Sequence, residues 1–326
     1  MINRRMILAS APVAAAAVGS APAIAQSAAA PAPAASGSAQ APGFYRYKVG
    51  DIEVTAIHDG FAMRPLENFV RNAELADVKK AMAEAFLPDT ALPITFTTLV
   101  LKTGGKTVLI DTGNGDTGAP TSGTWMRNFR AAGFDPAQVD TVLISHFHGD
   151  HINGLRLKDG TAVFPKAEVM VPETEWAFWT DDGRMSAAPD AMKPAFQNVR
   201  RVFGPMMKDV KQFGPDKELV AGVTGVAAYG HTPGHTAFRI ASGGKQLLMV
   251  VDITNHPALF VRNPSWAAVF DMDADKARET RVKMLDMVAA DRAQVAFYHA
   301  PFPATGHVLK EGNGFRFVPV QWTPAV

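Results

Sequence analysis

The sequence predicts an α+β fold in which two β-sheets pack face to face with helices on the outside. The first observation is a repeated unit: LVLKTGGKTVLIDTGN (residues 99–114) resembles RIASGGKQLLMVVDITN (residues 239–255). Each unit is a strand, a Gly-Gly turn and an apolar strand that ends in Asp. The second observation is that helical patterns separate and follow the two units. This order of strands and helices is typical of two β-rich halves within one domain.

Composition limits both the partners and the chemistry. The chain has 326 residues, of which 47% are hydrophobic, so it can bury a full core. A net charge of +1 gives no reason to expect a nucleic-acid partner. The absence of cysteine excludes disulfides, thiolate nucleophiles and thiolate metal ligands. A metal would have to be held by His, Asp and Glu, which suits zinc and similar divalent ions.

Residues 1–25 are predicted to be a signal peptide. Arg4 and Arg5 precede an alanine-rich apolar stretch, and Ala23-Ile24-Ala25 fits a cleavage site. The paired arginines also fit a twin-arginine signal, although general secretory export remains open. The apolar stretch is shorter than a membrane span. We therefore expect an exported protein, periplasmic or secreted, without a membrane anchor after cleavage.

Residues 26–43 form a predicted flexible linker of Ala, Pro, Ser, Gly and Gln, and residues 44–326 form the catalytic domain. Alternating polarity predicts the strands of this domain, and helical spacing predicts its helices. The expected elements are a hairpin over 45–49 and 52–58, a helix over 73–86, strands over 94–102 and 107–111, a short helix near 125–129, a strand over 142–145, helices within 173–215, strands over 237–241 and 246–252, a helix over 273–292, and strands over 295–298 and 315–322.

Four potential metal ligands lie within six residues, directly after the apolar run 142–144: His146, His148, Asp150 and His151. Side chains alternate along an extended chain, so His146 and His148 share a face and can bind one ion together. Asp150 and His151 lie past the turn and can reach a second ion.

Three later strand ends carry further candidates, namely His231, Asp252 and His299. Seven groups are too many for one tetrahedral zinc but suit two ions that share a ligand. Asp252 is the natural bridge because its carboxylate has two oxygens. His307 competes with His299 for the last position, and His299 is favoured because it directly follows a strand.

The segment His146–His151 matches the H-x-H-x-D-H signature of the metallo-β-lactamase superfamily. Nearly the whole mature chain also resembles methyl parathion hydrolase and its lactonase relatives. The segments that carry this second resemblance are 41–46, 50–56, 230–236 and 314–320. The resemblance implies an αββα sandwich, two divalent metal ions per chain with zinc favoured, and a homodimer.

The resemblance also implies a role for each candidate. One ion would take His146, His148 and His231, the other would take Asp150, His151 and His299, and Asp252 would bridge them. A hydroxide between the ions would be the nucleophile, with Asp150 accepting its proton. Asp111 would support a ligand histidine from a buried Asp-Thr-Gly turn.

The expected substrate is a small lactone, ester or phosphotriester. The loop 114–120 contains no aromatic residue. In methyl parathion hydrolase an aromatic residue of this loop helps to line the pocket for the leaving group. Its absence here makes aryl phosphotriesters a weaker candidate. We expect Trp179 and Phe196 to supply an aromatic pocket wall, within a lid formed by 173–215. His256 is a further candidate to face the substrate, whereas His58 and His235 are expected to be structural.

Two alternatives differ in chemistry. One is β-lactamase-type amide hydrolysis, which is disfavoured because that branch usually lacks an acid at the position of Asp252. The other is a non-hydrolytic metal-binding module, which would require a closed site without a position for water.

Overall fold

The computed structural model describes residues 40–326. The predicted signal peptide (1–25) and most of the predicted linker (26–43) lie outside these residues. Residues 41–326 form one compact unit, and its first strand begins at Phe44. None of the helices in this part of the chain has the length and apolar character needed to cross a bilayer.

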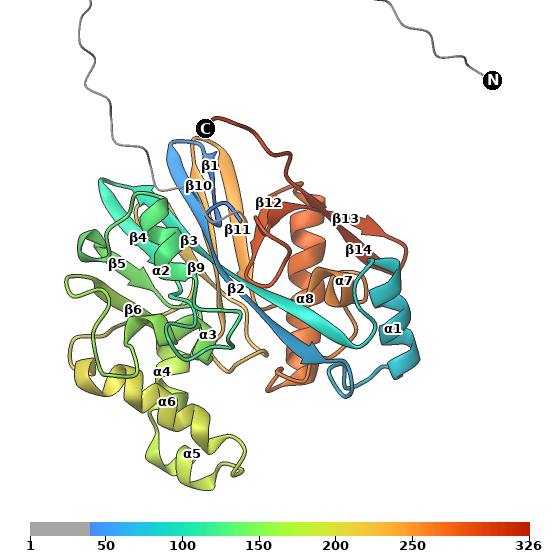
Figure 1. Cartoon of the computed structure of the whole chain (residues 1–326), viewed down its shortest axis with the longest axis horizontal. Helices are drawn as coiled ribbons and strands as arrows, with labels where there is room; N and C mark the ends of the chain where they lie inside the picture. The colour runs from blue at the N-terminus through green and yellow to red at the C-terminus, as the bar shows by residue number, and fades with distance from the viewer. Residues whose placement is uncertain (1–39) are drawn as a thin grey trace, which may run out of the picture. The chain divides into compact units, whose positions relative to one another are not determined.

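The unit contains two seven-stranded sheets (Figure 1). The first has its strands in chain order; strands β1 to β4 are antiparallel, and β4 to β7 are parallel. Its strands are β1 (Phe44–Val49), β2 (Ile52–Pro65), β3 (Ala91–Thr103), β4 (Lys106–Ile110), β5 (Thr141–Leu143), β6 (Glu168–Pro172) and β7 (Lys211–Phe213).

The second sheet has the order β14-β13-β12-β11-β10-β9-β8, and only β11 and β12 pair in parallel. Its strands are β8 (Glu218–Val220), β9 (Val223–Ala227), β10 (Thr236–Ser242), β11 (Lys245–Val251), β12 (Gln294–Phe297), β13 (Thr305–Glu311) and β14 (Gly314–Pro319). The two repeated sequence units are therefore one hairpin in each sheet, β3–β4 and β10–β11.

Side-chain alternation along the central strands builds the layers. In β11, Leu247 and Met249 belong to the core shared by both sheets, whereas Leu248 and Val250 belong to the core under helix α8 (Ala274–Ala290). In β3, Val100 likewise faces the helices that cover the first sheet. Strands buried on both faces read as continuous apolar runs. The predicted fold class, two sheets face to face with helices outside, is confirmed.

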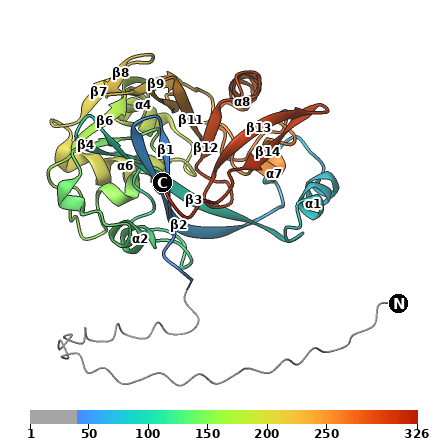
Figure 2. The ribbon, with the colours of Figure 1, turned by 90° about the horizontal axis from the view of Figure 1, so that it is seen from above.

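The helices are α1 (Leu75–Glu84), α2 (Trp125–Ala131), α3 (Gly149–Ile152), α4 (Glu173–Trp179), α5 (Asp182–Ala187), α6 (Lys193–Phe203), α7 (Pro257–Phe260) and α8 (Ala274–Ala290), with short 3-10 turns at Pro136–Gln138, Asn153–Leu155 and Gly204–Met206. Helices α2, α4 and α6 cover the outer face of the first sheet and α8 covers that of the second, whereas α1 and α7 add apolar residues to the core shared by both sheets (Figures 1 and 2).

Three sequence-based expectations need correction. The segment 173–215 is helical as expected, but its helices pack against the outer face of the first sheet rather than forming a lid. The last strand ends at Pro319 and pairs with β13, a strand that was not predicted; His307, Leu309 and Lys310 of β13 are exposed. On α8, helical spacing predicts one apolar face with Val282, Leu285, Val288 and Ala289, but Val282 is 38% exposed, whereas Arg281 is buried.

Candidate metal centre

The seven predicted ligands meet at one end of the sandwich, where strands of both sheets finish. β5 leads to His146, β9 leads to His231, β11 leads to Asp252 and β12 leads to His299. The ligand atoms form two groups, and within each group they all lie within 4.8 Å of one another. The groups are His146, His148, His231 and Asp252, and Asp150, His151 and His299.

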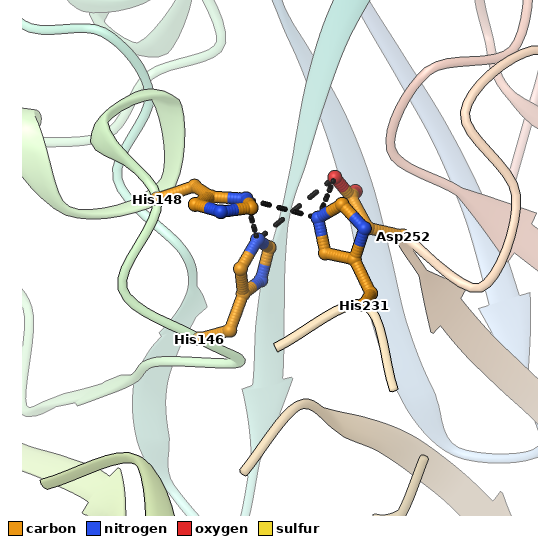
Figure 3. Close-up of side chains that lie close together, drawn as sticks. All are labelled: His146, His148, His231 and Asp252. Carbon is orange, nitrogen blue, oxygen red and sulfur yellow. Dashed lines mark hydrogen bonds and ion pairs between the residues drawn. The ribbon is translucent and has the colours of Figure 1, made fainter. Parts of the chain in front are cut away.

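Figure 3 shows the first group converging on one point, with His146 and His148 on one side and His231 and Asp252 on the other. The Nδ1 atom of His148 lies 3.1 Å from Nε2 of His146 and 2.9 Å from Nε2 of His231. Asp252 Oδ2 lies 3.3 Å from His231 Nε2 and 3.9 Å from His146 Nε2. Nitrogen ligands of a tetrahedral zinc are about 3.3 Å apart, so the group has nearly the required spacing.

The second group shares Asp252 with the first. Asp150 Oδ2 lies 3.5 Å from His151 Nε2 and 3.6 Å from His299 Nε2. Asp252 Oδ2 lies 3.5 Å from His151 Nε2 and 3.0 Å from His299 Nε2. One carboxylate oxygen is therefore near histidines of both groups, which is the placement expected of a bridging ligand.

The local backbone explains why neighbouring residues serve different groups. His148 is extended (φ −66°, ψ 152°), and helix α3 begins at Gly149. His146 and His148 therefore project from extended chain, whereas Asp150 and His151 project from a helical turn.

Asp252 follows a strained position. Val251 has φ +51°, a left-handed value that is rare for a β-branched residue. The pairing of β11 with β12 also shifts register between Met249 and Val251. The backbone N–H of Asp252 then donates to Nε2 of His235 at 3.1 Å, so His235 helps to hold the bend. Such strain is characteristic of functional sites.

In four of the ligand histidines, the ring nitrogen that faces away from the centre has its own hydrogen-bond partner. Asp111 Oδ2 lies 2.8 Å from His151 Nδ1, in the supporting place expected of it, and Asp271 Oδ1 lies 3.0 Å from His231 Nδ1. The remaining contacts are His299 Nδ1 with the Thr95 carbonyl at 2.8 Å and His146 Nδ1 with Ser145 Oγ at 3.0 Å. These contacts fix each ring so that its other nitrogen points to the centre.

The protonation states expected for the histidines of the centre are also compatible with bound cations. Burial, reinforced by His231, lowers the pKa of His148 to about 3, so its imidazole is neutral and able to bind a metal. Burial would also lower the pKa of His231, but Asp252 and Asp271 raise it to about 9. A cation can replace the proton that these carboxylates otherwise attract.

Two ligand atoms are left without partners. Nε2 of His151 and Oδ1 of Asp252 are buried, and neither has a hydrogen-bond partner among residues 40–326. Buried polar atoms are normally paired, so unpaired atoms within a set of His and Asp donors indicate a place for metal ions.

The comparisons with known proteins agree with this geometry. The family model of the metallo-beta-lactamase superfamily matches residues 93–299. The chain belongs to this superfamily. A search of curated proteins gave no significant match.

Two solved structures are similar to this protein over most of the chain. The hydrolase AbOPH is 27% identical with a TM-score of 0.83, and the match covers 87% of this chain and all (100%) of that one. AidC, a dizinc quorum-quenching lactonase with a bound homoserine product, is 27% identical with a TM-score of 0.81, covering 86% and 98% of the two chains. A probable metal-dependent hydrolase from Staphylococcus aureus shares the fold at 19% identity and a TM-score of 0.70.

The purified superfamily member should hold about two divalent ions per chain, because its donor set divides into two groups. Removing them with a chelator should lower the melting temperature, since ions that bind only the folded state stabilise it. Elemental analysis and thermal unfolding measure the two effects. A chelated protein with unchanged stability and full hydrolytic activity would contradict the prediction.

A cavity of about 580 Å³ opens onto both ligand groups. Its floor includes Asp150 and Asp252, and its walls come from β2, β3 and the loop 114–119. The lining residues outside the two ligand groups are Ala62, Met63, Arg64, Ile94, Phe96, Asn114, Thr117, Gly118, Ala119, Gly149, Asn255 and Phe270. Phe96 and Phe270 thus supply the aromatic side chains of this cavity.

The structure corrects the expected aromatic wall. Trp179 and Phe196 are only 1% and 0% exposed and do not line the cavity. Their rings pack at 4.7 Å in the core between the first sheet and its helices. The reason is that α4 and α6 lie on the outer face of that sheet, away from the cavity.

His256 and His307 also lie elsewhere. His256 caps helix α7, accepting a hydrogen bond from Ala258 N at 3.2 Å, and borders a separate cavity of about 480 Å³ beside α1 and β14. It therefore does not face the site. His307 is exposed on β13, which leaves His299 as the histidine at the centre.

Proposed function

We propose that this protein hydrolyses lactones and other neutral carboxylic esters with the help of two divalent metal ions, with zinc favoured. The observation that carries the proposal is that two His/Asp groups share Asp252 and open onto one cavity whose wall includes Met63, Ile94, Phe96 and Phe270. The superfamily match also supports the broader statement that the protein is a metal-dependent hydrolase, without naming a substrate.

In the proposed site, His146, His148 and His231 would hold one ion, and Asp150, His151 and His299 the other, with Asp252 between them. Such a pair of ions supplies an activated water at neutral pH and polarises the substrate oxygen. Asp150 lines the cavity with its side chain 23% exposed. Its carboxylate can accept the proton that the nucleophile loses and deliver it to the leaving alkoxide.

The charge state of Asp150 suits this role. Burial alone would raise the pKa of Asp150, but the neighbouring His151 and His299 hold it below its usual range. The group is therefore an anion at neutral pH. Its Oδ2 lies 3.5 Å from His151 Nε2 and 3.6 Å from His299 Nε2, so it faces the centre.

The cavity favours a neutral substrate with an apolar part. Its volume suits a small molecule. Phe96, Phe270 and Met63 provide apolar surface, and Arg64 is the only Arg or Lys side chain in the lining within the described residues. The 27% identity to the lactonase AidC supports a lactone as the leading substrate.

Phosphotriesters are the second candidate. The resemblance of the sequence to methyl parathion hydrolase favours them. The wall formed by Asn114, Thr117, Gly118 and Ala119 weighs against aryl phosphotriesters, because no aromatic side chain lies there.

A substrate panel on one zinc-loaded preparation tests the proposal. It should contain acyl-homoserine lactones, dihydrocoumarin, an aryl ester, an aryl phosphotriester and a chromogenic cephalosporin. We expect the highest kcat/KM for a lactone, and loss of all activities when the metal is removed. A cephalosporin as the fastest substrate would instead indicate β-lactamase chemistry, and no turnover of any compound would favour a binding module.

A further inference from the structure

Glu175, on helix α4, is a fully buried carboxylate that the proposed reaction does not use. Its Oε1 accepts hydrogen bonds from Phe147 N at 3.0 Å and Trp179 Nε1 at 2.7 Å. Its Oε2 accepts hydrogen bonds from Thr232 Oγ1 at 2.9 Å and Gly234 N at 2.7 Å. Each oxygen thus has two donors, which is how a protein accommodates a buried carboxylate.

The donors indicate that Glu175 is ionised. Three of the four are N–H groups, which can only donate, and they reach both oxygens. Burial raises the pKa of Glu175, and the hydrogen bonds from Phe147, Gly234 and Thr232 oppose that shift by stabilising the anion.

Three of the four donors belong to the two loops that carry the histidines of the first ligand group. Phe147 stands between His146 and His148, in the loop after β5 of the first sheet. Thr232 and Gly234 follow His231 in the turn between β9 and β10 of the second sheet. One carboxylate therefore joins ligand loops from different sheets.

The turn between β9 and β10 lies in close contact with the start of α4. A Cβ added at Gly234 would lie 2.2 Å from the backbone nitrogen of Glu175, so only glycine allows the loop to rest against the start of α4. Across this junction His148 Nδ1 and His231 Nε2 are 2.9 Å apart. The separation of these two nitrogens thus depends on how the loops are held together.

The second ligand group has other supports. His151 is held by Asp111, and His299 is held by the carbonyl of Thr95. Within the part of the chain that the structure describes, none of the four hydrogen bonds of Glu175 reaches the loop of His299 or that of Asp252.

The geometry points to Glu175 as the positioning residue of one metal site: it sets the spacing of His146, His148 and His231 and so tunes the affinity of one of the two ions. This inference rests on the proposed dinuclear function. It predicts an effect on one ion only, which a general loss of stability would not produce.

Replacing Glu175 with Gln tests it. The new amide nitrogen cannot accept from an N–H group, so either Gly234 N or Phe147 N loses its partner. We expect the zinc affinity of one ion to fall about 10- to 100-fold, the range for groups that orient ligands, with the other ion unchanged. Competition with a chromogenic chelator measures both affinities. Anomalous scattering from crystals should show reduced zinc occupancy beside His146, His148 and His231.

Glu173→Gln is the matched control, because Glu173 is exposed on the same helix and undergoes the same change of charge. It should bind both ions as the wild type does. Thr232→Val is a second, milder variant that removes one donor and keeps the carboxylate. It should weaken the same ion, so the inference remains testable if Glu175→Gln does not fold.

The outcomes are distinct. A wild-type protein with two ions and a Glu175→Gln variant of equal affinity would overturn the positioning role alone, as would equal weakening of both ions. Wild-type-like affinity in a folded Thr232→Val variant would also count against it. A wild-type protein that binds fewer than two ions would overturn the proposed function, and this inference with it.

Discussion

Replacing Asp252 with Asn should abolish nearly all hydrolysis while leaving the chain folded. Asp252 Oδ2 lies 3.0 Å from His299 Nε2 and 3.3 Å from His231 Nε2, so it is the group that joins the two ligand sets. An amide of the same shape lacks the negative charge that two adjacent cations require. We expect activity to fall by more than about a hundredfold, which is the upper range for changes at groups that only orient ligands.

Metal content separates this effect from simple misfolding. The Asp252→Asn protein should bind fewer than two ions per chain while its circular dichroism stays that of the wild type. Asp190→Asn is the matched control, since the Asp190 side chain is 95% exposed and pairs with Lys193 at the surface. An Asp252→Asn protein with two tightly bound ions and near-normal turnover would exclude the bridging role.

The ligands could be predicted because their signal is local. His146 to His151 carry their spacing within one short segment, and Asp252 and His299 each follow an apolar run directly. Chain direction and strand alternation are enough to place such residues at one end of a sheet. The same reasoning predicted the two hairpins with Gly-Gly turns, which the structure places in different sheets.

The cavity wall could not be predicted in this way. An aromatic residue on a helix packs into the core or faces a cavity according to which side of the sheet the helix covers. For Trp179 and Phe196 the helices lie on the outer face, and the pocket aromatics are instead Phe96 and Phe270. Sequence spacing carries no information about that choice.

The burial of two charged residues also could not be predicted from the sequence. Glu175 looks like any acidic residue in the first turn of a short helix, and its burial depends on two loops that are distant in sequence. On α8, Arg281 is a charged residue within a helix, yet it is 0% exposed. Helical spacing from Ala277 and Leu285 puts it on the buried face, and only the carbonyl groups it meets there make a cation acceptable.

Arg281 should therefore contribute strongly to stability. Its guanidinium donates to Asp271 Oδ2 at 3.0 Å and to the carbonyl of Pro264 at 3.2 Å, and it also donates to Ile253 O beside the Asp252 loop. Replacing Arg281 with Met keeps a long helix-forming side chain but leaves the Asp271 carboxylate buried without its cation. Breaking a buried pair in this way costs about 3–5 kcal/mol of unfolding free energy.

Urea unfolding of the metal-free proteins measures this loss without a contribution from bound ions. Arg278→Met is the control, because Arg278 lies on the same helix, is 35% exposed and pairs with Asp275, so its loss should cost about 0–1 kcal/mol. Asp271 also holds His231 Nδ1, so Arg281→Met should weaken zinc binding at that histidine in addition. A free energy of unfolding within about 1 kcal/mol of the wild type, the range of exposed pairs, would show that the carboxylate is compensated by His231 alone.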